Sequence, residues 1–261
     1  MRFFSADEDF VGHFDEHGFA AIRGLLSTEE VEEYRRLYAR FLSGAIEVGP
    51  HRSDLASHCD PHKVGVENVT QIMWPSHHVP ELHERVLHRR CLALARRLLG
   101  PDVAFDFDML IDKAPETNTS TPWHQDAAYW PDLPDKRAAS FWVALDPATR
   151  ENGCMWFVPG SHGQPMRPHR SAGPGGGFFT CDASEAEAVA IELDPGGCTI
   201  HHGHMLHYTR GNSTGTRRRA FILNYRPQAM IEIERERGFD HGLHDNVRRV
   251  RNVQAEATLP R

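Results

Sequence analysis

The second half of the chain is a series of short strand-like segments separated by turn residues, and this pattern limits the fold more than any other feature. From residue 101 onward, short apolar runs alternate with Gly, Pro, Asn and Asp. Helical patterns do not lie between them, which disfavours a doubly wound parallel sheet. We expect a mainly β fold (α+β) with flanking helices, an antiparallel sandwich or barrel. The expected strands are 103–113, 138–144, 155–158, 188–193, 198–202, 205–208 and 219–225.

The first hundred residues are expected to be largely helical. Ser5-Ala-Asp-Glu8 and Ser27-Thr-Glu-Glu30 both have the capping-box pattern that opens a helix. A third helix is expected over 81–99, with Gly100-Pro101 as its stop, and a short strand over 19–22. We expect a single domain over 1–261, divided into a helical part (1–100), a barrel core (101–226) and a C-terminal extension (227–261).

Composition excludes several classes of protein. The 261 residues are 40% hydrophobic and 25% charged, which is typical of a globular protein with a substantial core. The net charge of -7 argues against a nucleic-acid partner, and no apolar run is long enough to span a membrane. The first residues lack a signal-peptide pattern, so we expect a cytoplasmic protein. Five scattered cysteines without a Cys-x-x-Cys pair argue against a structural zinc site or disulfide framework.

Eighteen histidines are more than a fold of this size needs, and they direct attention to metal chemistry. The strongest local pattern is Trp123-His124-Gln125-Asp126. In a strand, positions i and i+2 project from the same face, so His124 and Asp126 can converge on one ion while Gln125 points elsewhere. A lone His-x-Asp is common by chance, and ordinary surface polarity explains most such pairs.

A second candidate ligand strengthens the metal hypothesis. His207 lies on another expected strand, and two histidines with one carboxylate form the facial triad of non-haem Fe(II) enzymes. Arg217, Arg218 and Arg219 follow closely, and a guanidinium can grip a carboxylate through two parallel hydrogen bonds. Alternation along a strand places neighbouring arginines on opposite faces, but it does not decide which face points to the carboxylate. Arg217 therefore remains a candidate as well as Arg218.

The order and spacing of several motifs resemble those of the phytanoyl-CoA dioxygenase-like family of Fe(II)/2-oxoglutarate-dependent oxygenases. The resemblance is close over roughly residues 103–226 and looser in the N-terminal part, at His17-Gly-Phe19 and Leu25-Leu-Ser27. The motifs that carry it are Thr121-Pro-Trp-His-Gln-Asp126, Phe141-Trp-Val-Ala-Leu-Asp146, Asn152-Gly153, Pro159-Gly-Ser-His162, His202-Gly203, Leu206-His207, Asn212 and Arg218.

The resemblance implies a double-stranded β-helix, a jelly-roll barrel similar to that of cupins, with iron at its open end. It implies three iron ligands, His124, Asp126 and His207, and it selects Arg218 as the partner of the distal 2-oxoglutarate carboxylate. Four further residues are implied to lie near the co-substrate or substrate: Thr209, Trp142, Met109 and Gln125.

The sequence departs from the family at one place. Members often have a lysine before the barrel that helps to hold 2-oxoglutarate, whereas this chain reads Asn68-Val-Thr-Gln-Ile-Met73, so Thr70 or Gln71 would have to substitute. The carboxylate at Asp126 argues for oxygenation, because related halogenases have a small residue there. His202 stays open as an alternative metal ligand. A Ser161–His162 nucleophile pair is disfavoured, since adjacent residues cannot readily form the required hydrogen bond.

We therefore expect a dioxygenase that oxidises a C–H bond of a small organic molecule, with hydroxylation as the expected outcome. Its co-substrates would be 2-oxoglutarate and dioxygen, with succinate and carbon dioxide as products. Two alternatives are a zinc-dependent or other metal-dependent cupin-like hydrolase or isomerase, and a non-catalytic barrel that binds a small ligand. The substrate and oligomeric state are left open, and the glycine-rich segment 165–180 is expected to act as a lid.

Overall fold

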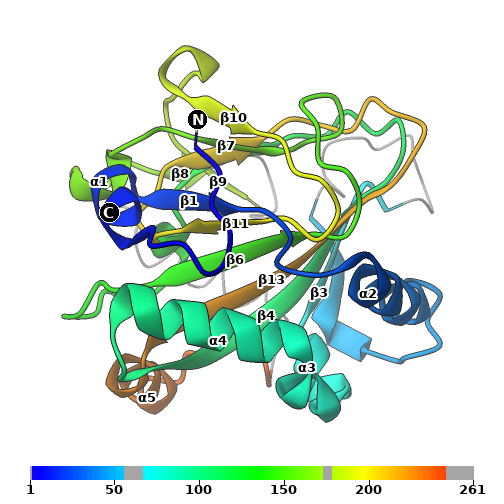
Figure 1. Ribbon diagram of the computed structural model, residues 1–261, viewed down its shortest axis with the longest axis horizontal. Helices are drawn as coiled ribbons and strands as arrows, with labels where there is room; N and C mark the ends of the chain where they lie inside the picture. Colours follow the sequence, from blue (N-terminus) through cyan, green and yellow to red (C-terminus); the bar gives the residue numbers. More distant parts are fainter. Residues whose placement is uncertain (1, 56–66, 173–177, 245–261) are drawn as a thin grey trace.

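A computed structural model describes residues 2–55, 67–172 and 178–244, and its described part is dominated by two antiparallel sheets (Figure 1). None of the helices in these ranges is both long and apolar enough to cross a lipid bilayer. The larger sheet has the order β1 (Phe19–Ile22), β11 (Cys198–His201), β6 (Ala139–Ala144), β13 (Arg218–Pro227), β4 (Val103–Lys113), β3 (Val69–Met73) and β2 (Arg52–Asp54). The smaller has the order β10 (Val189–Ile191), β7 (Met155–Phe157), β12 (His207–Thr209) and β5 (Thr121–His124).

The two sheets pack face to face, and side chains of the larger sheet alternate between two cores. In β6, Trp142 and Ala144 point toward the smaller sheet, whereas Phe141 and Val143 point to the opposite face. The core that contains Trp142 lies between the sheets, and the core that contains Phe141 lies beneath the helices. This arrangement confirms the jelly-roll expectation. Within the described residues the sheets share no hydrogen-bonded ladder, so the barrel is an open two-sheet sandwich.

Helices cover the outer face of the larger sheet, where α4 runs across β13 and β4 (Figure 1). Five α-helices and five 3-10 turns are described, together with a third, two-stranded sheet. The helices are α1 (Val11–His17), α2 (Thr28–Leu42), α3 (Pro75–His78), α4 (Val86–Leu99) and α5 (Gln228–Glu236). The 3-10 turns are η1 (Gly49–His51), η2 (Pro80–Glu84), η3 (Asp126–Tyr129), η4 (Ser161–Gly163) and η5 (Glu185–Glu187), and the small sheet pairs β8 (Arg170–Ser171) with β9 (Phe179–Thr180).

The two capping-box patterns have different outcomes. Ser27 accepts a hydrogen bond from the Glu30 N–H while the Glu30 carboxylate accepts one from Ser27, and α2 begins there as predicted. At the first pattern the prediction of a helix is wrong. The Glu8 N–H donates to the Ser5 backbone carbonyl, and α1 begins only at Val11. The local pattern formed a turn instead of a helix.

Most predicted strands are present within two residues of their expected ends, and those over 19–22 and 103–113 match their bounds. The helix expected over 81–99 is interrupted, because η2 ends at Glu84 and Arg85 is extended before α4. The N-terminal hundred residues also contain β2 and β3, which extend the larger sheet beyond β4.

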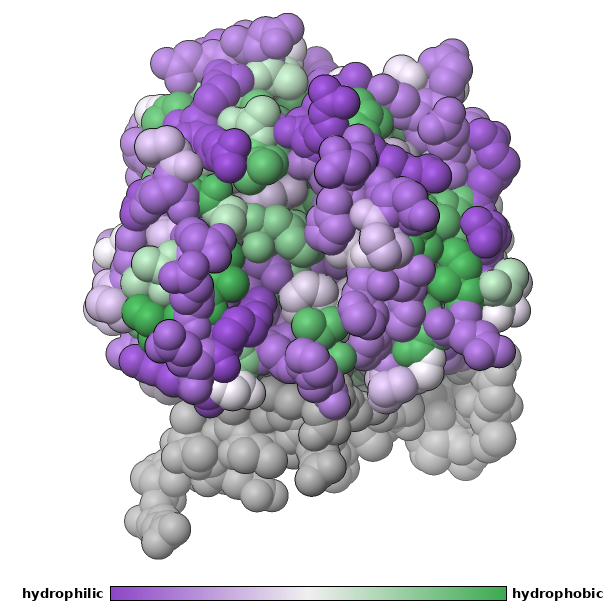
Figure 2. Space-filling model, turned by 90° about the horizontal axis from the view of Figure 1, so that it is seen from below, coloured by the Kyte–Doolittle hydropathy of each residue, from purple (hydrophilic) through white to green (hydrophobic). Residues whose placement is uncertain are grey.

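The outer surface is mostly hydrophilic. Figure 2 shows one face of the molecule, on which hydrophobic side chains form separate patches between polar ones. Among the described residues, Met166 is the one exposed large hydrophobic residue, with an exposed fraction of 44%. The apolar surface of the chain is therefore largely used in the two cores and in the cavity between the sheets.

Candidate metal centre

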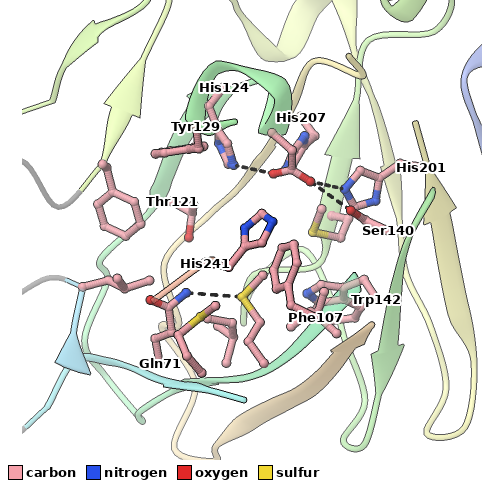
Figure 3. A pocket seen from close by; sticks show the side chains of 18 of the residues that line it. Gln71, Phe107, Thr121, His124, Tyr129, Ser140, Trp142, His201, His207 and His241 are labelled. Carbon is pink, nitrogen blue, oxygen red and sulfur yellow. Dashed lines mark hydrogen bonds and ion pairs between the residues drawn. The ribbon is translucent and has the colours of Figure 1, made fainter. Parts of the chain in front are cut away.

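Three potential ligands meet at one end of the cavity between the sheets (Figure 3). His124 ends β5 and His207 begins β12, and the two face each other as cross-strand partners. Asp126 Oδ1 lies 3.6 Å from Nε2 of each histidine. The expectation that His124 and Asp126 share one strand is wrong, because the strand ends at His124 and Asp126 opens the 3-10 turn η3. The turn nevertheless brings the carboxylate to the same side.

Backbone contacts fix the tautomer of both histidines. His124 Nδ1 lies 2.7 Å from the Pro122 carbonyl oxygen, and His207 Nδ1 lies 2.8 Å from the Met205 carbonyl oxygen. A carbonyl oxygen only accepts, so both Nδ1 atoms must carry the proton and donate. Each Nε2 therefore directs its lone pair toward Asp126, which is the arrangement that a metal ligand needs.

The second carboxylate oxygen of Asp126 is held by the protein. Ser140 Oγ donates to Oδ2 at 3.0 Å, and His201 Nε2 lies 3.3 Å from the same oxygen. Ser140 Oγ also lies 2.5 Å from the Asn224 amide oxygen, while Asn224 Nδ2 has no partner among the described residues. Turning the Asn224 amide by 180° gives a consistent chain in which Asn224 donates to Ser140 and Ser140 donates to Asp126.

The protonation states that result are those of a metal site. Burial by itself raises the pKa of Asp126, but His207, His124 and His201 hold this pKa well below its usual range. Burial lowers the pKa of His207 well below its usual value. Near neutral pH the group therefore contains an ionised Asp126 and a neutral His207, which suits Fe(II).

An unpaired arginine lies in the same cavity. Arg218 is the first residue of β13, is 1% exposed, and its Nε and Nη1 atoms have no hydrogen-bond partner within the described ranges. Its guanidinium lies 5.0 Å from the centre of the Trp142 ring. Burial lowers the pKa of Arg218 to about 10, so it remains charged at neutral pH. A buried cation with free donors is a binding site for an anion, and its fork matches a carboxylate.

The neighbouring arginines are used elsewhere. Arg217 forms an ion pair with the buried Asp112, and Arg219 donates to both oxygens of Asp146 at 2.8 Å. Neither lines the cavity. Of the two candidates Arg217 and Arg218, Arg218 is therefore the one whose hydrogen-bond donors are available to a ligand.

Other expected co-substrate residues divide into two groups. Trp142 and Met109 line the cavity, as does Gln71, which donates to Met109 Sδ at 3.2 Å and whose amide oxygen has no partner in the described part of the chain. Thr70 does not line the cavity, and its hydroxyl donates to Glu67. Of the two residues considered as substitutes for the family lysine, Gln71 is therefore the one that lines the cavity. Thr209 does not line the cavity either, although its buried hydroxyl has no partner among the described residues.

Several sequence candidates lie away from the centre. Gln125 donates to the His204 carbonyl and accepts from the Arg167 N–H, so it faces away from the cavity. His202 accepts from the His204 N–H instead of approaching Asp126. Ser161 Oγ accepts from the Leu206 N–H, a contact within the fold. The expected lid over 165–180 includes 173–177, which lie outside the described residues, and it stays a prediction.

Sequence reasoning missed the residues that support the ligands. Ser140 and His201 are cross-strand partners on β6 and β11, and only the strand register brings both to Asp126. Their signal in the sequence was weak, because a serine and a histidine in strands are common. Lys113 was also missed. It is fully buried, and its ammonium donates to the Thr119 and Arg210 carbonyls at 3.0 and 2.5 Å, so it holds loops together near Arg218.

Known proteins share this architecture. Phytanoyl-CoA dioxygenase domain-containing protein 1 of Mus musculus is 32% identical over 123 residues, 44% of this chain and 42% of that protein. Peroxisomal phytanoyl-CoA dioxygenase of Rattus norvegicus is 24% identical over 224 residues, 81% of this chain and 66% of that protein. The chain thus matches less than two thirds of the length of either relative.

The structure of EvdO2 from Micromonospora carbonacea var. aurantiaca, complexed with 2-oxoglutarate, is 29% identical with a TM-score of 0.68, covering 84% of this chain and 90% of that one. The family model described as phytanoyl-CoA dioxygenase (PhyH) matches residues 14–220, from α1 into β13. The chain therefore belongs to the phytanoyl-CoA dioxygenase family.

Proposed function

We propose that the protein is an Fe(II)/2-oxoglutarate-dependent dioxygenase that oxidises a C–H bond of a small organic molecule. The observation that carries this proposal is the joint presence, in one cavity, of a two-histidine, one-carboxylate group and a buried arginine whose Nε and Nη1 have no partner among the described residues. A metal ion satisfies the first and a carboxylate satisfies the second. A 2-oxo acid with a second carboxylate can engage both at once.

The residues present fit iron. His124 Nε2, His207 Nε2 and Asp126 Oδ1 would hold Fe(II), and the hydrogen bonds on Asp126 Oδ2 favour coordination through one carboxylate oxygen only. Three positions would then remain for 2-oxoglutarate and dioxygen. When bound, the iron would supply a C–H oxidation in which 2-oxoglutarate, dioxygen and the substrate are converted to succinate, carbon dioxide and the hydroxylated substrate, with one oxygen atom going to succinate and the other to the product.

The chain's own contribution is binding, orientation and exclusion of water. Arg218 would bind the far carboxylate of 2-oxoglutarate through its guanidinium, with Trp142 packed against this group. The Gln71 amide and the Met109 side chain form the adjacent wall. A titratable side chain is not required as a general base, because the cofactor carries the reaction.

Neither alternative explains the cavity as well. A zinc-dependent hydrolase or isomerase would have no use for the unpaired Arg218. A non-catalytic ligand-binding barrel would have no use for two histidines whose Nδ1 atoms are both anchored so that Nε2 faces a carboxylate.

The test begins under anaerobic conditions, where Fe(II) and 2-oxoglutarate together should give a weak visible charge-transfer band. Air is then admitted in the presence of a panel of small metabolites, and succinate is measured. Asp126→Ala should lose both signals. Absence of the band and of succinate in a protein that hydrolyses esters or amides with zinc would contradict the proposal.

A further inference from the structure

We infer that His241 forms a substrate-binding subsite that accepts a hydrogen bond from an O–H or N–H group of a small molecule with a flat apolar body. This inference rests on the proposed function, because it assigns the substrate side of the same cavity. It is carried by the contacts of one imidazole ring, and none of the metal ligands takes part in it.

His241 follows α5 and is fixed in an uncommon conformation. Its backbone φ is 52°, in the left-handed region that non-glycine residues rarely adopt, and its residue exposure is 5%. The Trp74 indole N–H donates to its carbonyl at 3.3 Å. The ring lines the cavity, and Figure 3 shows it in this view between the metal-binding side chains and Gln71. Strain of this kind persists where the surrounding structure holds a side chain in place.

The rear of the ring is held by a buried ionic cluster. His241 Nε2 lies 3.3 Å from Asp106 Oδ2 and 3.4 Å from Glu234 Oε2. These three side chains have the spacing of a metal site, but two guanidinium groups already occupy the carboxylates. Arg226 donates to both Asp106 and Glu234, and Arg235 donates to Asp106 Oδ1 at 2.6 Å. The cluster is therefore an anchor for the ring and not a cation site.

The cluster fixes which ring nitrogen carries the proton. Arg226 Nη2 lies 3.2 Å from His241 Nε2, but its two protons are already donated to Asp106 Oδ2 and Glu234 Oε2. Nε2 therefore cannot accept from Arg226, and it donates to the carboxylates. Nδ1 is left as an acceptor without a partner among the described residues.

Aromatic side chains define the rest of the subsite. The His241 ring stacks on Phe107 with centroids 3.8 Å apart, and Phe239 meets it edge-on at 4.7 Å. Trp130 lies edge-on at 6.4 Å, and all three line the cavity. A polar acceptor flanked by three aromatic side chains matches a ligand that has a donor group on a flat apolar body.

The test uses calorimetry on the anaerobic protein loaded with Fe(II) and 2-oxoglutarate. The probes are 2-phenylethanol and 2-(2-naphthyl)ethanol, their methyl ethers, which lack the donor, and phenylacetate, which has only acceptors. Wild-type protein should bind each alcohol roughly two- to tenfold more tightly than its ether, the value of one hydrogen bond. Phenylacetate should bind least well.

The matched variants are His241→Phe, which keeps the stacked ring but removes the acceptor, and His244→Phe, an exposed position three residues on. The preference for alcohols should disappear in the first and persist in the second. A preference that survives His241→Phe, or a wild-type preference for phenylacetate, would overturn the inference. Nitrogen NMR of wild-type protein loaded with zinc gives an answer independent of variant folding, since a protonated Nδ1 would also overturn it. Calorimetry requires no turnover, so absence of succinate would count against the proposed function alone.

Discussion

At the scale of single residues, Asp126 uses its two carboxylate oxygens for different purposes. Oδ1 faces the Nε2 atoms of His124 and His207, while Oδ2 is held by Ser140 and His201. Groups that orient a ligand in this way stabilise metal binding, because the carboxylate needs no rearrangement when the ion arrives. Metal affinity is therefore expected to depend on residues that would never touch the metal.

The first prediction concerns these supporting residues. His201→Phe and Ser140→Ala should each weaken Fe(II) or Co(II) binding by about 10- to 100-fold, and Asp126→Ala should abolish it. The Co(II) absorption spectrum should also shift, because the carboxylate is free to rotate. His202→Phe is the matched control, since His202 bonds the His204 backbone. An unchanged metal affinity and an unchanged Co(II) spectrum in both supporting variants would show that metal binding does not depend on the contacts to Asp126 Oδ2.

The second prediction concerns the co-substrate anchor. Loss of one partner from a desolvated charged pair costs ~2–5 kcal/mol, so Arg218→Ala should raise the 2-oxoglutarate requirement by about tens-fold to thousands-fold. Arg217→Ala and Arg219→Ala should have much smaller effects, because these side chains pair with Asp112 and Asp146. Titration with 2-oxoglutarate, followed by the charge-transfer band, measures this. A large effect at Arg217 with none at Arg218 would refute the assignment.

At the scale of secondary-structure elements, α2 shows how a local signal contributes to the fold. Its capping box is complete, and the helix buries Val31, Tyr34, Leu37, Tyr38 and Phe41 against the larger sheet. Ser27→Ala should lower the free energy of unfolding by about 1 kcal/mol, because the Glu30 N–H loses its acceptor.

Ser5 provides a matched control for this third prediction. It belongs to the same sequence pattern, but the helix that follows begins only at Val11. Ser5→Ala should therefore change stability by less than about 0.5 kcal/mol, as for a surface position outside a cap. Urea denaturation of both variants provides the comparison. Equal losses would mean that the Ser5 turn stabilises the fold as much as a true cap.

At the scale of the whole molecule, partly buried neutral histidines make stability depend on pH. Desolvation, helped by His204 and His162, lowers the pKa of His202 to about 3, and desolvation also lowers the pKa of His169. In the unfolded chain these groups titrate near ~6.5. Below that pH the unfolded state binds more protons than the folded state, so acidification favours unfolding.

The fourth prediction follows from this loss of stability on acidification. The urea midpoint should fall as the pH is lowered from 7.5 to 5, and His202→Gln should reduce the size of that fall because it removes one of the protons taken up on unfolding. The comparison is made in metal-free protein, so that loss of iron does not contribute. A midpoint that rises on acidification, or an identical slope in the variant, would contradict the prediction.

The sequence by itself determined the type of fold and most of the chemistry. Short apolar runs separated by turn residues predicted the antiparallel sheets, because this pattern can be recognised within a short stretch of sequence. The spacing of His124 and Asp126, with His207 downstream, indicated the ligand set. The three consecutive arginines limited the candidates for binding the co-substrate carboxylate to a few residues. The prediction of the sheets is confirmed because it depends on residue type and on a local pattern, whereas the roles of these site residues stay predictions.

Only the tertiary structure decided which groups meet. Arg218 is the arginine whose Nε and Nη1 donors are free of partners in the described ranges, whereas Arg217 pairs with the buried Asp112 on β4 and Arg219 with the buried Asp146 just after β6. His201 and Ser140 reach Asp126 through the register of β11 and β6, and a turn, not strand alternation, delivers Asp126 itself. His241 lies in a C-terminal segment without a readable pattern, and its tautomer depends on side chains 7 to 135 residues away in sequence. Contacts between distant segments depend on register and packing, and a local sequence pattern does not encode either one.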